Sequence, residues 1–356
     1  MVTGLSIIVP SFHSGSIIDQ CLKAIDAELK NSSQYYEILV IDSSLQPPLL
    51  PQLPNLILYH SSAKLFASEA RNIGARIAKY PTLVFVDADV IILPEAIQKL
   101  VNDLQAGVDG VGGVYEIHNS NTSRISTYQD LFLLFRYKNI PHDKNFFSSA
   151  QFAVGKETFW EVEGFSENLQ SYEDVDLGFK LQRKFFKINV CFDSRGYHLK
   201  NFTLKSIFKD YFVKTRNMIY YRLSKLNGLE LSDTFFPKSM RVSYCLIFGY
   251  LSLFLMVVTL GSPATISLEV AALGLLLILD ICLLTPFLIF VWTETHRSLW
   301  VLGALIFFKA TTVPIICGAI QGFYMLFKND GSIINSVKSG HDISALSITK
   351  YSEDEL

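Results

Sequence analysis

The residues best placed to do chemistry are two aspartates that follow a short apolar segment. The segment 82–86 reads TLVFV, and Asp87-Ala88-Asp89 comes directly after it. If this segment is a strand, Asp87 and Asp89 project to the same side, because alternate residues of a strand share a face. Carboxylate oxygens are preferred ligands of a hard divalent cation, which in turn can hold a diphosphate. The alternative is that the two aspartates only end the strand.

A second group of acids opens an expected helix at EDVDLGFKL. A hydroxyl is a poor nucleophile and needs a positioned base as it attacks, so Asp174 is a candidate general base, and Glu173 and Asp176 are candidates to orient it or the attacking group. The alternative is that these acids only stabilise the first turn of the helix, where its dipole favours negative charge. His198 is a candidate third contact to a metal or a phosphate, although a lone histidine more often has a structural role.

Alternating strand and helix patterns position these acids. The expected strands are 5–9, 37–41, 57–60 and 82–86, and the expected helices begin near Ile17 and at Ala67. This alternation predicts an α/β fold with a mostly parallel sheet and helices on both faces. Ligands bind such sheets at the carboxyl ends of the strands. Pro10, Asp42 and Asp87 all lie at such ends, so we expect them to gather at one edge of the sheet.

Five motifs carry a resemblance to a known family. VPSF, VIDSS, EARNIGARIA, FVDAD and SYEDVDLGFKL occur in an order and spacing similar to those of family 2 glycosyltransferases, over about residues 4 to 200. The resemblance implies the GT-A nucleotide-diphospho-sugar transferase fold, a nucleotide-diphospho-sugar donor, Mg²⁺ or Mn²⁺ as cofactor, and inversion of the anomeric carbon.

The resemblance also implies roles for single residues. The implied donor-binding residues lie after the first two strands, in the helix that begins at Ala67, and in the Asp-x-Asp motif. The implied metal ligand and the implied base lie in the two acidic motifs. The resemblance implies that Pro10 and Asp42 lie around the nucleotide base, Arg71 near the nucleotide and Asp87 near the ribose or sugar, that Asp89 binds the metal, and that Asp174 is the catalytic base. From the residues themselves, Ser11 is a further candidate for donor binding, Asp87 and His198 are further candidate metal ligands, and Glu173 is a further candidate catalytic residue.

Some positions depart from the family pattern. Phe12-His13 replaces the frequent Tyr-Asn, and Ser43 replaces a frequent acid, so the sequence leaves the identity of the nucleotide open. The Gln-x-x-Arg-Trp motif of processive polysaccharide synthases is missing, because the chain reads LQRKFFKI after the acidic cluster. This favours transfer of one sugar over polymerisation.

The C-terminal part is apolar enough to predict a membrane anchor. The chain is 50% hydrophobic, and the excess lies in the segments 242–260, 268–292 and 299–327. Each is long enough to cross about 30 Å of hydrocarbon at about 1.5 Å per residue. The alternative is three buried helices of a soluble protein. Basic residues flank the first span and the second loop, which predicts a multi-pass protein of the plasma or inner membrane with a cytosolic catalytic domain.

The expected domain plan follows these composition changes. It comprises a GT-A catalytic domain at 1–200, a basic amphipathic helix and linker at 201–240, about three transmembrane helices at 241–328, and a polar tail at 329–356. The basic helix either lies in the lipid headgroup plane or packs on the catalytic domain. The apolar stretch 128–137 is either core or dips toward the membrane. Pro314 is a candidate interruption of the third span.

Two ionisable residues lie inside the apolar segments. Asp280 and Lys309 are at comparable distances from the loop that joins their segments. A lone charge in such a segment costs at least about 2.5–3.5 kcal/mol on insertion scales. We therefore expect the two side chains to pair, if the two helices pack antiparallel. The alternative is that Lys309 faces a lipid phosphate.

These observations favour a membrane-anchored, inverting, hexosyltransferase-like enzyme of cell envelope polysaccharide biosynthesis. Its expected partners are a nucleotide-diphospho-sugar, a lipid-linked or glycan acceptor and membrane lipids, and an oligomer is compatible with the sequence. The net charge of −2 argues against a nucleic-acid partner, and five cysteines without metal spacing are expected to be free thiols. The alternatives are a polysaccharide synthase that extrudes its product and a non-catalytic membrane scaffold that retains the fold.

Overall fold

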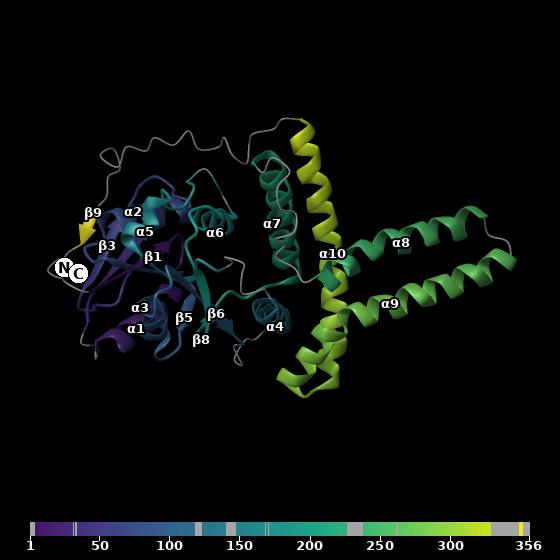
Figure 1. Ribbon diagram of the computed structural model, residues 1–356, viewed down its shortest axis with the longest axis horizontal. Coiled ribbons are helices and arrows are strands. Elements are labelled where there is room, and N and C mark those ends of the chain that lie inside the picture. Colours follow the sequence, from purple (N-terminus) through teal and green to yellow (C-terminus); the bar gives the residue numbers. More distant parts are fainter. Residues whose placement is uncertain are drawn as a thin grey trace.

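The computed structural model describes residues 4–351 except 31, 33, 118–122, 140–146, 168, 170, 226–237, 261–262 and 329–348. A sheet with flanking helices forms one part of the molecule, and long helices form the other (Figure 1). We call the first part the sheet unit. The expected catalytic domain corresponds to this sheet unit.

Nine described strands form one sheet, in the order β5-β8-β6-β7-β4-β1-β2-β3-β9. β4, β1, β2 and β3 run parallel, as expected from the sequence. β7 pairs antiparallel with both β4 and β6, so the sheet is mixed rather than mostly parallel. The strands are β1 Gly4–Ser11, β2 Tyr35–Asp42, β3 Leu56–His60, β4 Thr82–Val86, β5 Val90–Ile92, β6 Gly110–Glu116, β7 Gln151–Gly155, β8 Ile188–His198 and β9 Thr349–Tyr351.

The central strands are continuous apolar runs because helices cover both faces of the sheet. Alternate residues of β1 enter different cores: Ile7 packs with α1 and α3, and Ile8 packs with α2, α5 and α6. Ile17, near which the sequence predicts the first helix to begin, is the exposed first residue of α1. The flanking helices are α1 Ile17–Leu29, α2 Ala67–Ile77, α3 Ala96–Gln105, α5 Lys156–Glu161 and α6 Glu173–Arg183.

A third core joins the sheet unit to the long helices. Phe132 and Phe135 of α4 pack against Phe287 of α9, and Phe132 also meets Phe308 of α10. The apolar stretch 128–137 is therefore core. The helices that meet here are α4 Arg124–Lys138, α7 Leu204–Lys225, α8 Lys238–Leu260, α9 Pro263–Thr295 and α10 Ser298–Phe327.

The three C-terminal helices do not form a bundle of parallel rods. α8 and α9 form a hairpin that projects away from the sheet unit, whereas α10 runs across the base of this hairpin beside α7 (Figure 1). α10 continues through Pro314, so the expected interruption does not occur. Among the described residues, two helical segments are long and apolar enough to cross a membrane, Glu269–Thr295 and Ser298–Phe327. Two of the three predicted spans are thus candidates by length and composition, and the segment 242–260 lies in α8.

Asp280 and Lys309 form the expected ion pair where α10 crosses α9. Asp280 also accepts hydrogen bonds from Ser243 and from Tyr250 of α8, and Lys309 Nζ donates to Ser243 Oγ at 3.1 Å. Asp280 is buried, which makes these partners necessary. The pair is confirmed, although the side-by-side antiparallel packing that suggested it is replaced by a crossing.

The basic helix expected after residue 200 is α7, and it packs on the sheet unit as well as on α10. Of the two expected arrangements, the structure has the packed one. Part of the following linker, 226–237, lies outside the described residues. Most of the polar tail does too, but Thr349–Tyr351 adds to the sheet as β9, an antiparallel edge strand that the sequence did not predict.

Candidate active site

Asp87 and Asp89 leave β4 in the middle of the sheet, as the sequence predicts, and a buried arginine ties them to α6. Arg71 of α2 donates from Nη2 to Asp87 Oδ1 at 2.6 Å and from Nη1 to Glu173 Oε1 at 3.0 Å. The Arg71 side chain is only 3% exposed. Burial opposes its charge, but the two carboxylates outweigh burial and raise the pKa of Arg71. Arg71 therefore stays charged and holds the two acidic motifs together.

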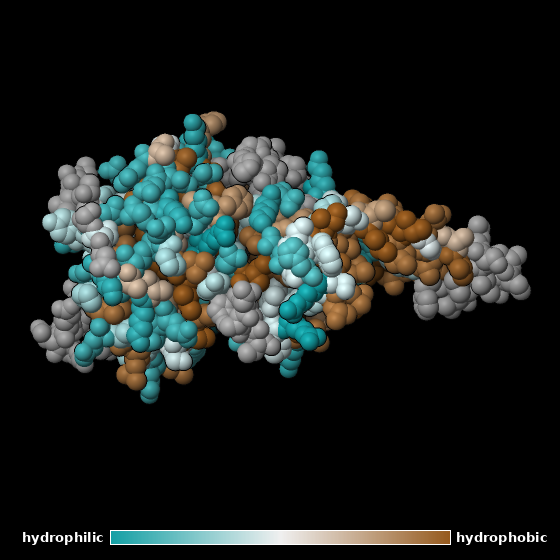
Figure 2. Space-filling view, turned by 90° about the horizontal axis from the view of Figure 1, so that it is seen from below, coloured by the Kyte–Doolittle hydropathy of each residue, from teal (hydrophilic) through white to brown (hydrophobic). Residues whose placement is uncertain are grey.

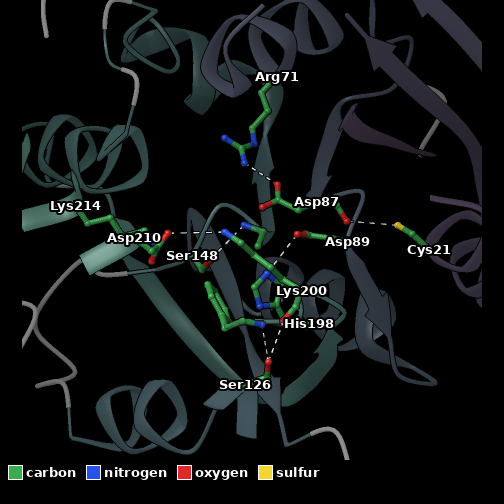
Figure 3. A network of polar contacts seen from close by, with 12 residues as sticks. Cys21, Arg71, Asp87, Asp89, Ser126, Ser148, His198, Lys200, Asp210 and Lys214 are labelled. Atoms are coloured by element: carbon green, nitrogen blue, oxygen red, sulfur yellow. Dashed lines mark hydrogen bonds and ion pairs between the residues drawn. The ribbon is translucent and has the colours of Figure 1, made fainter. Parts of the chain in front are cut away.

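The two aspartates of the motif differ in their electrostatics. Burial raises the pKa of Asp87 although Arg71 opposes this. Burial also acts on Asp89, but a hydrogen bond and charge from His198, with the charge of Lys200, bring the pKa of Asp89 below its usual value. His198 reaches the site because β8 pairs with β5, and its Nε2 lies 3.4 Å from Asp89 Oδ2 (Figure 3). Asp89 is thus the more strongly ionised carboxylate.

The candidate base lies in the first turn of α6. Tyr172, which precedes the helix, has a φ of 79°, a left-handed conformation that turns the chain into α6. Asp174 Oδ1 accepts a hydrogen bond from the backbone of Val175 at 2.8 Å. Burial, and then the charge of Glu173, raise the pKa of Asp174 to about 7. A carboxylate that titrates near neutral pH is suited to act as a general base.

Two cavities meet at the Asp-x-Asp motif. The first has a volume of about 310 Å³ and lies over the ends of β1 and β4. The second has a volume of about 360 Å³ and lies between β4, α4, α6 and α7. Both are lined by Arg71, Asp87 and Asp89, whereas Glu173, Asp174 and His198 line only the second. The structure thus brings together most of the predicted site residues in one cleft.

Among the predicted donor-binding residues, Pro10 and Ser11 line the first cavity, and Asp42 does not. Asp42 is fully buried, and its carboxylate accepts hydrogen bonds from Ser11, Ser44 and His60 at 2.7–2.9 Å. It therefore orders the strand ends beneath the cavity. The residues that line the cavity near β1 beyond those expected are Phe12, His13, Ser14, Ile17 and Ser43.

Cationic residues of α4, α7 and the segment after β8 were missed as site residues. Asp210 of α7 pairs with Lys214 at 2.8 Å and with Lys200 at 3.8 Å, and all three line the second cavity (Figure 3). Arg136 of α4 lines it too, and burial lowers the pKa of Arg136 to about 10. For Lys214 the signal was present in the basic pattern of α7, which the sequence left open between lipid headgroups and packing on the catalytic domain.

The acids fit the cation that the family resemblance implies only in part. Within the described part of the chain, no group of three or more His, Cys, Asp or Glu side chains is arranged to hold a metal ion. Mg²⁺, however, is often held by one or two carboxylates together with substrate phosphates. Asp89 supplies an ionised carboxylate, and one oxygen of Asp87 is already engaged by Arg71. This donor set suits a cation that arrives with a diphosphate.

Comparison with known proteins identifies the sheet unit. Residues 6–163 match the family model described as Glycosyl transferase family 2. The chain carries a family 2 glycosyltransferase domain. The match covers β1 to β7, including the Asp-x-Asp motif and Arg71, and ends before α6.

Relatives of this glycosyltransferase agree with the family match. An uncharacterized glycosyltransferase of Haemophilus influenzae is 26% identical over 215 residues, which cover 55% of this chain and 69% of that protein. Glycosyltransferase GlyG of Streptococcus pneumoniae is 26% identical over 108 residues, 28% of this chain and 35% of that protein. The chain thus spans only about a third of the second relative. Both relatives are named as glycosyltransferases.

A solved structure shares the fold over nearly the whole chain. The mannosyltransferase PcManGT from Pyrobaculum calidifontis, solved with GDP-Man and Mn²⁺, has a TM-score of 0.59 and 14% identity. The likeness covers 90% of this chain and 87% of that one. At this identity it shows the GT-A fold with its C-terminal helices, and the expected fold class is confirmed.

Proposed function

We propose that this glycosyltransferase moves one sugar, with inversion, from a nucleotide-diphospho-sugar to a lipid-linked acceptor at the cytosolic face of a membrane. The main support is that two cavities share Arg71, Asp87 and Asp89 in their walls. One cavity is lined by Pro10, Ser11, Arg71 and Asp87, four of the five predicted donor-binding residues, and the other is lined by the predicted base. A transferase needs these two compartments to share one reacting centre.

The first cavity suits the donor nucleotide. Phe12 is an exposed aromatic side chain at its rim, with the Lys64 ammonium 4.9 Å from its ring centre. Asp87 and Asp89, with His198 orienting Asp89, would hold Mg²⁺ or Mn²⁺, which when bound neutralises charge on the diphosphate leaving group. PcManGT was solved with a nucleotide-sugar and Mn²⁺, which supports a divalent cation here.

Asp174 has the chemistry of a base for the attacking hydroxyl. Its raised pKa lets it accept a proton near neutral pH and release it afterwards. Glu173 is held by Arg71, so it keeps the first turn of α6 close to the Asp-x-Asp motif. In-line attack from the side of Asp174, opposite the leaving diphosphate, inverts the anomeric carbon.

The far wall of the second cavity supports a lipid-linked acceptor. It is formed by α4 and α7, which also pack on the apolar helices α9 and α10. Arg136 and Lys214 are cationic residues of this wall, and Lys200 lies beside it, with Asp210 paired to both lysines. A phosphate that links an acceptor to a lipid would meet these cations while its lipid lies against the apolar helices.

The test is a survey of donors with native membranes that contain the protein. Each radiolabelled nucleotide-sugar is incubated with the membranes, and lipids are then extracted. We expect label from one donor in the lipid fraction, dependent on Mg²⁺ or Mn²⁺ and absent with Asp174→Asn. Label that stays in water-soluble glycans, with the lipid fraction empty, would contradict a lipid-linked acceptor.

A further inference from the structure

α7 contacts the segment that carries the predicted base at two points. Asn217 Nδ2 donates to Ser171 Oγ at 2.7 Å, and the Tyr221 hydroxyl donates to Asp176 Oδ1. Asn217 and Tyr221 lie one helical turn apart and therefore share a face of α7. Ser171 and Asp176 lie before and after Asp174. The two contacts thus bracket the base from one side.

The bracketed segment needs such support. Tyr172 adopts a left-handed conformation that non-glycine residues seldom take, and its ring lies 6.0 Å from that of Tyr221. Such a conformation persists only where its surroundings hold it. Asp176 is also held by Ser166, which donates to Oδ2 at 2.5 Å. The position of Asp174 is therefore set by side chains of α7 as well as by α6 itself.

The opposite face of α7 is closely packed on α10. A Cβ atom at Gly318 would lie 2.4 Å from the backbone oxygen of Phe212, and one at Gly322 would lie 2.7 Å from that of Arg216. Atoms do not approach so closely, so only glycine allows the two backbones to lie together here. We call this close backbone contact at Gly318 and Gly322 the glycine seam between α7 and α10.

The outer side of α10 is an apolar surface. Figure 2 shows hydrophobic residues gathered over the long helices and hydrophilic residues over the sheet unit. The core helix of a soluble protein is mostly buried, whereas only 33% of the apolar segment of α10 is buried. Its length and composition point to lipid as the occupant. The exposed apolar residues of α10 include Leu299, Leu302, Ile306, Val313, Ile320 and Phe323.

We propose that Asn217 and Tyr221 are positioning residues, through which the packing of α10 at the lipid surface sets the geometry of Asp174. The path runs from lipid to α10, across the glycine seam to α7, and from α7 to the first turn of α6. This inference rests on the proposed transferase function with Asp174 as base. Turnover then depends on the lipid surface, although no lipid touches the base.

The first test removes one hydroxyl. Tyr221→Phe keeps the ring and loses the hydrogen bond to Asp176. We expect kcat to fall about 10–100-fold, the usual effect of a misplaced reacting group, with the KM for the donor unchanged. Tyr220→Phe is the matched control, because Tyr220 is the preceding residue and packs with Met325 of α10 instead. It should keep the wild-type kcat.

A pH profile separates positioning from a merely structural role. Loss of folded enzyme lowers kcat/KM by the same factor at every pH. Loss of positioning exposes Asp174 to water, so in Tyr221→Phe the acid limb of the profile should move below its wild-type value, toward that of an ordinary carboxylate. A Tyr221→Phe enzyme with the wild-type kcat and acid limb would overturn the inference. Asn217→Ala should repeat the effect.

The second test opens the seam between α7 and α10. Gly318→Ala should lower kcat in vesicles of phosphatidylethanolamine and phosphatidylglycerol to the value that wild type shows in detergent. Gly274→Ala, in α9, is the control, because a Cβ atom there meets nothing within 4 Å. Equal stimulation of wild type and Gly318→Ala by vesicles would contradict the coupling.

Different results would overturn the proposed function and the proposed coupling between α10 and Asp174. A wild-type protein that transfers no sugar, or an Asp174→Asn variant with full activity, overturns the proposed function. An active wild type, an inactive Asp174→Asn and fully active Tyr221→Phe and Gly318→Ala variants overturn only the coupling.

Discussion

Arg71 with its two carboxylates in the cleft and the Asp280–Lys309 pair at the helix crossing both join different elements of the molecule, and they are built in opposite ways. In the cleft, Arg71 is shared by Asp87 and Glu173, and Asp89 and Asp174 line the same cavity. At the helix crossing, one carboxylate, Asp280, is satisfied by one lysine and two hydroxyls. The cleft gathers more negative than positive charge around its central cation, whereas the crossing is balanced.

This difference distinguishes a candidate active site from a structural contact between helices. In the cleft, burial and then the charge of the neighbouring Glu173 raise the pKa of Asp174, and the carboxylate oxygens not engaged by Arg71 can take up an added cation. A balanced pair satisfies its own charges and mainly fixes how helices meet. Burial and pairing alone therefore do not mark a functional site, but an excess of one charge beside a cavity does.

The largest effect should come from removing Asp89, one of the carboxylates that line the cleft. Asp89→Ala should lower turnover by about 10³-fold, because a bound cation is worth several kcal/mol to charge stabilisation in the transition state. The variant should also bind a nucleotide-sugar with an affinity that no longer responds to EDTA. Isothermal titration with and without EDTA measures this. Donor affinity that responds to EDTA as in wild type would remove Asp89 from the metal site.

A smaller effect should come from protonation of Asp174 as the pH falls. The base works only when deprotonated, and the pKa of Asp174 is raised to about 7. The kcat/KM value should therefore be highest above pH 7 and fall about tenfold for each pH unit below it. An activity profile from pH 5 to 9 at saturating metal tests this sign. Activity that rises as the pH falls below 7 would assign Asp174 the role of an acid instead.

The smallest effect should come from the balanced pair. Asp280→Asn and Lys309→Gln should each destabilise the protein, and their coupling energy should be about 0.5–3 kcal/mol because the side chains touch. Unfolding of micelle-embedded protein in a double-mutant cycle measures it. Donor binding should be unchanged in both variants. Purely additive losses of stability would mean that the pair contributes nothing.

The sequence predicted the parts of the site that depend on strand ends. The Asp-x-Asp motif, Arg71 and the acids of α6 could be placed because apolar strands and their carboxyl ends are local patterns. The Asp280–Lys309 pair could be predicted from the cost of a lone charge in an apolar helix. These inferences need no knowledge of distant contacts.

The features that the sequence did not predict depend on contacts between residues far apart in the chain. Asp42 follows a strand like Asp87, yet three side chains from β1, the β2 end and β3 cover it. Lys214 belongs to the basic helix that could have lain among lipid headgroups, but it lines the second cavity instead. The direction of α10 depends on glycines 318 and 322 meeting α7, which no period within α10 reveals.

The central claim is that Asp174 acts as the base in a cleft that joins donor and acceptor. The most direct measurement uses purified wild type and Asp174→Asn in lipid vesicles, with the donor found in the survey. Asp174→Asn keeps the size of the side chain but cannot accept the proton, so sugar transfer to extracted lipid should fall about 10²–10⁴-fold while donor affinity stays unchanged. Near wild-type transfer by Asp174→Asn would contradict the account and make Glu173 the next candidate base.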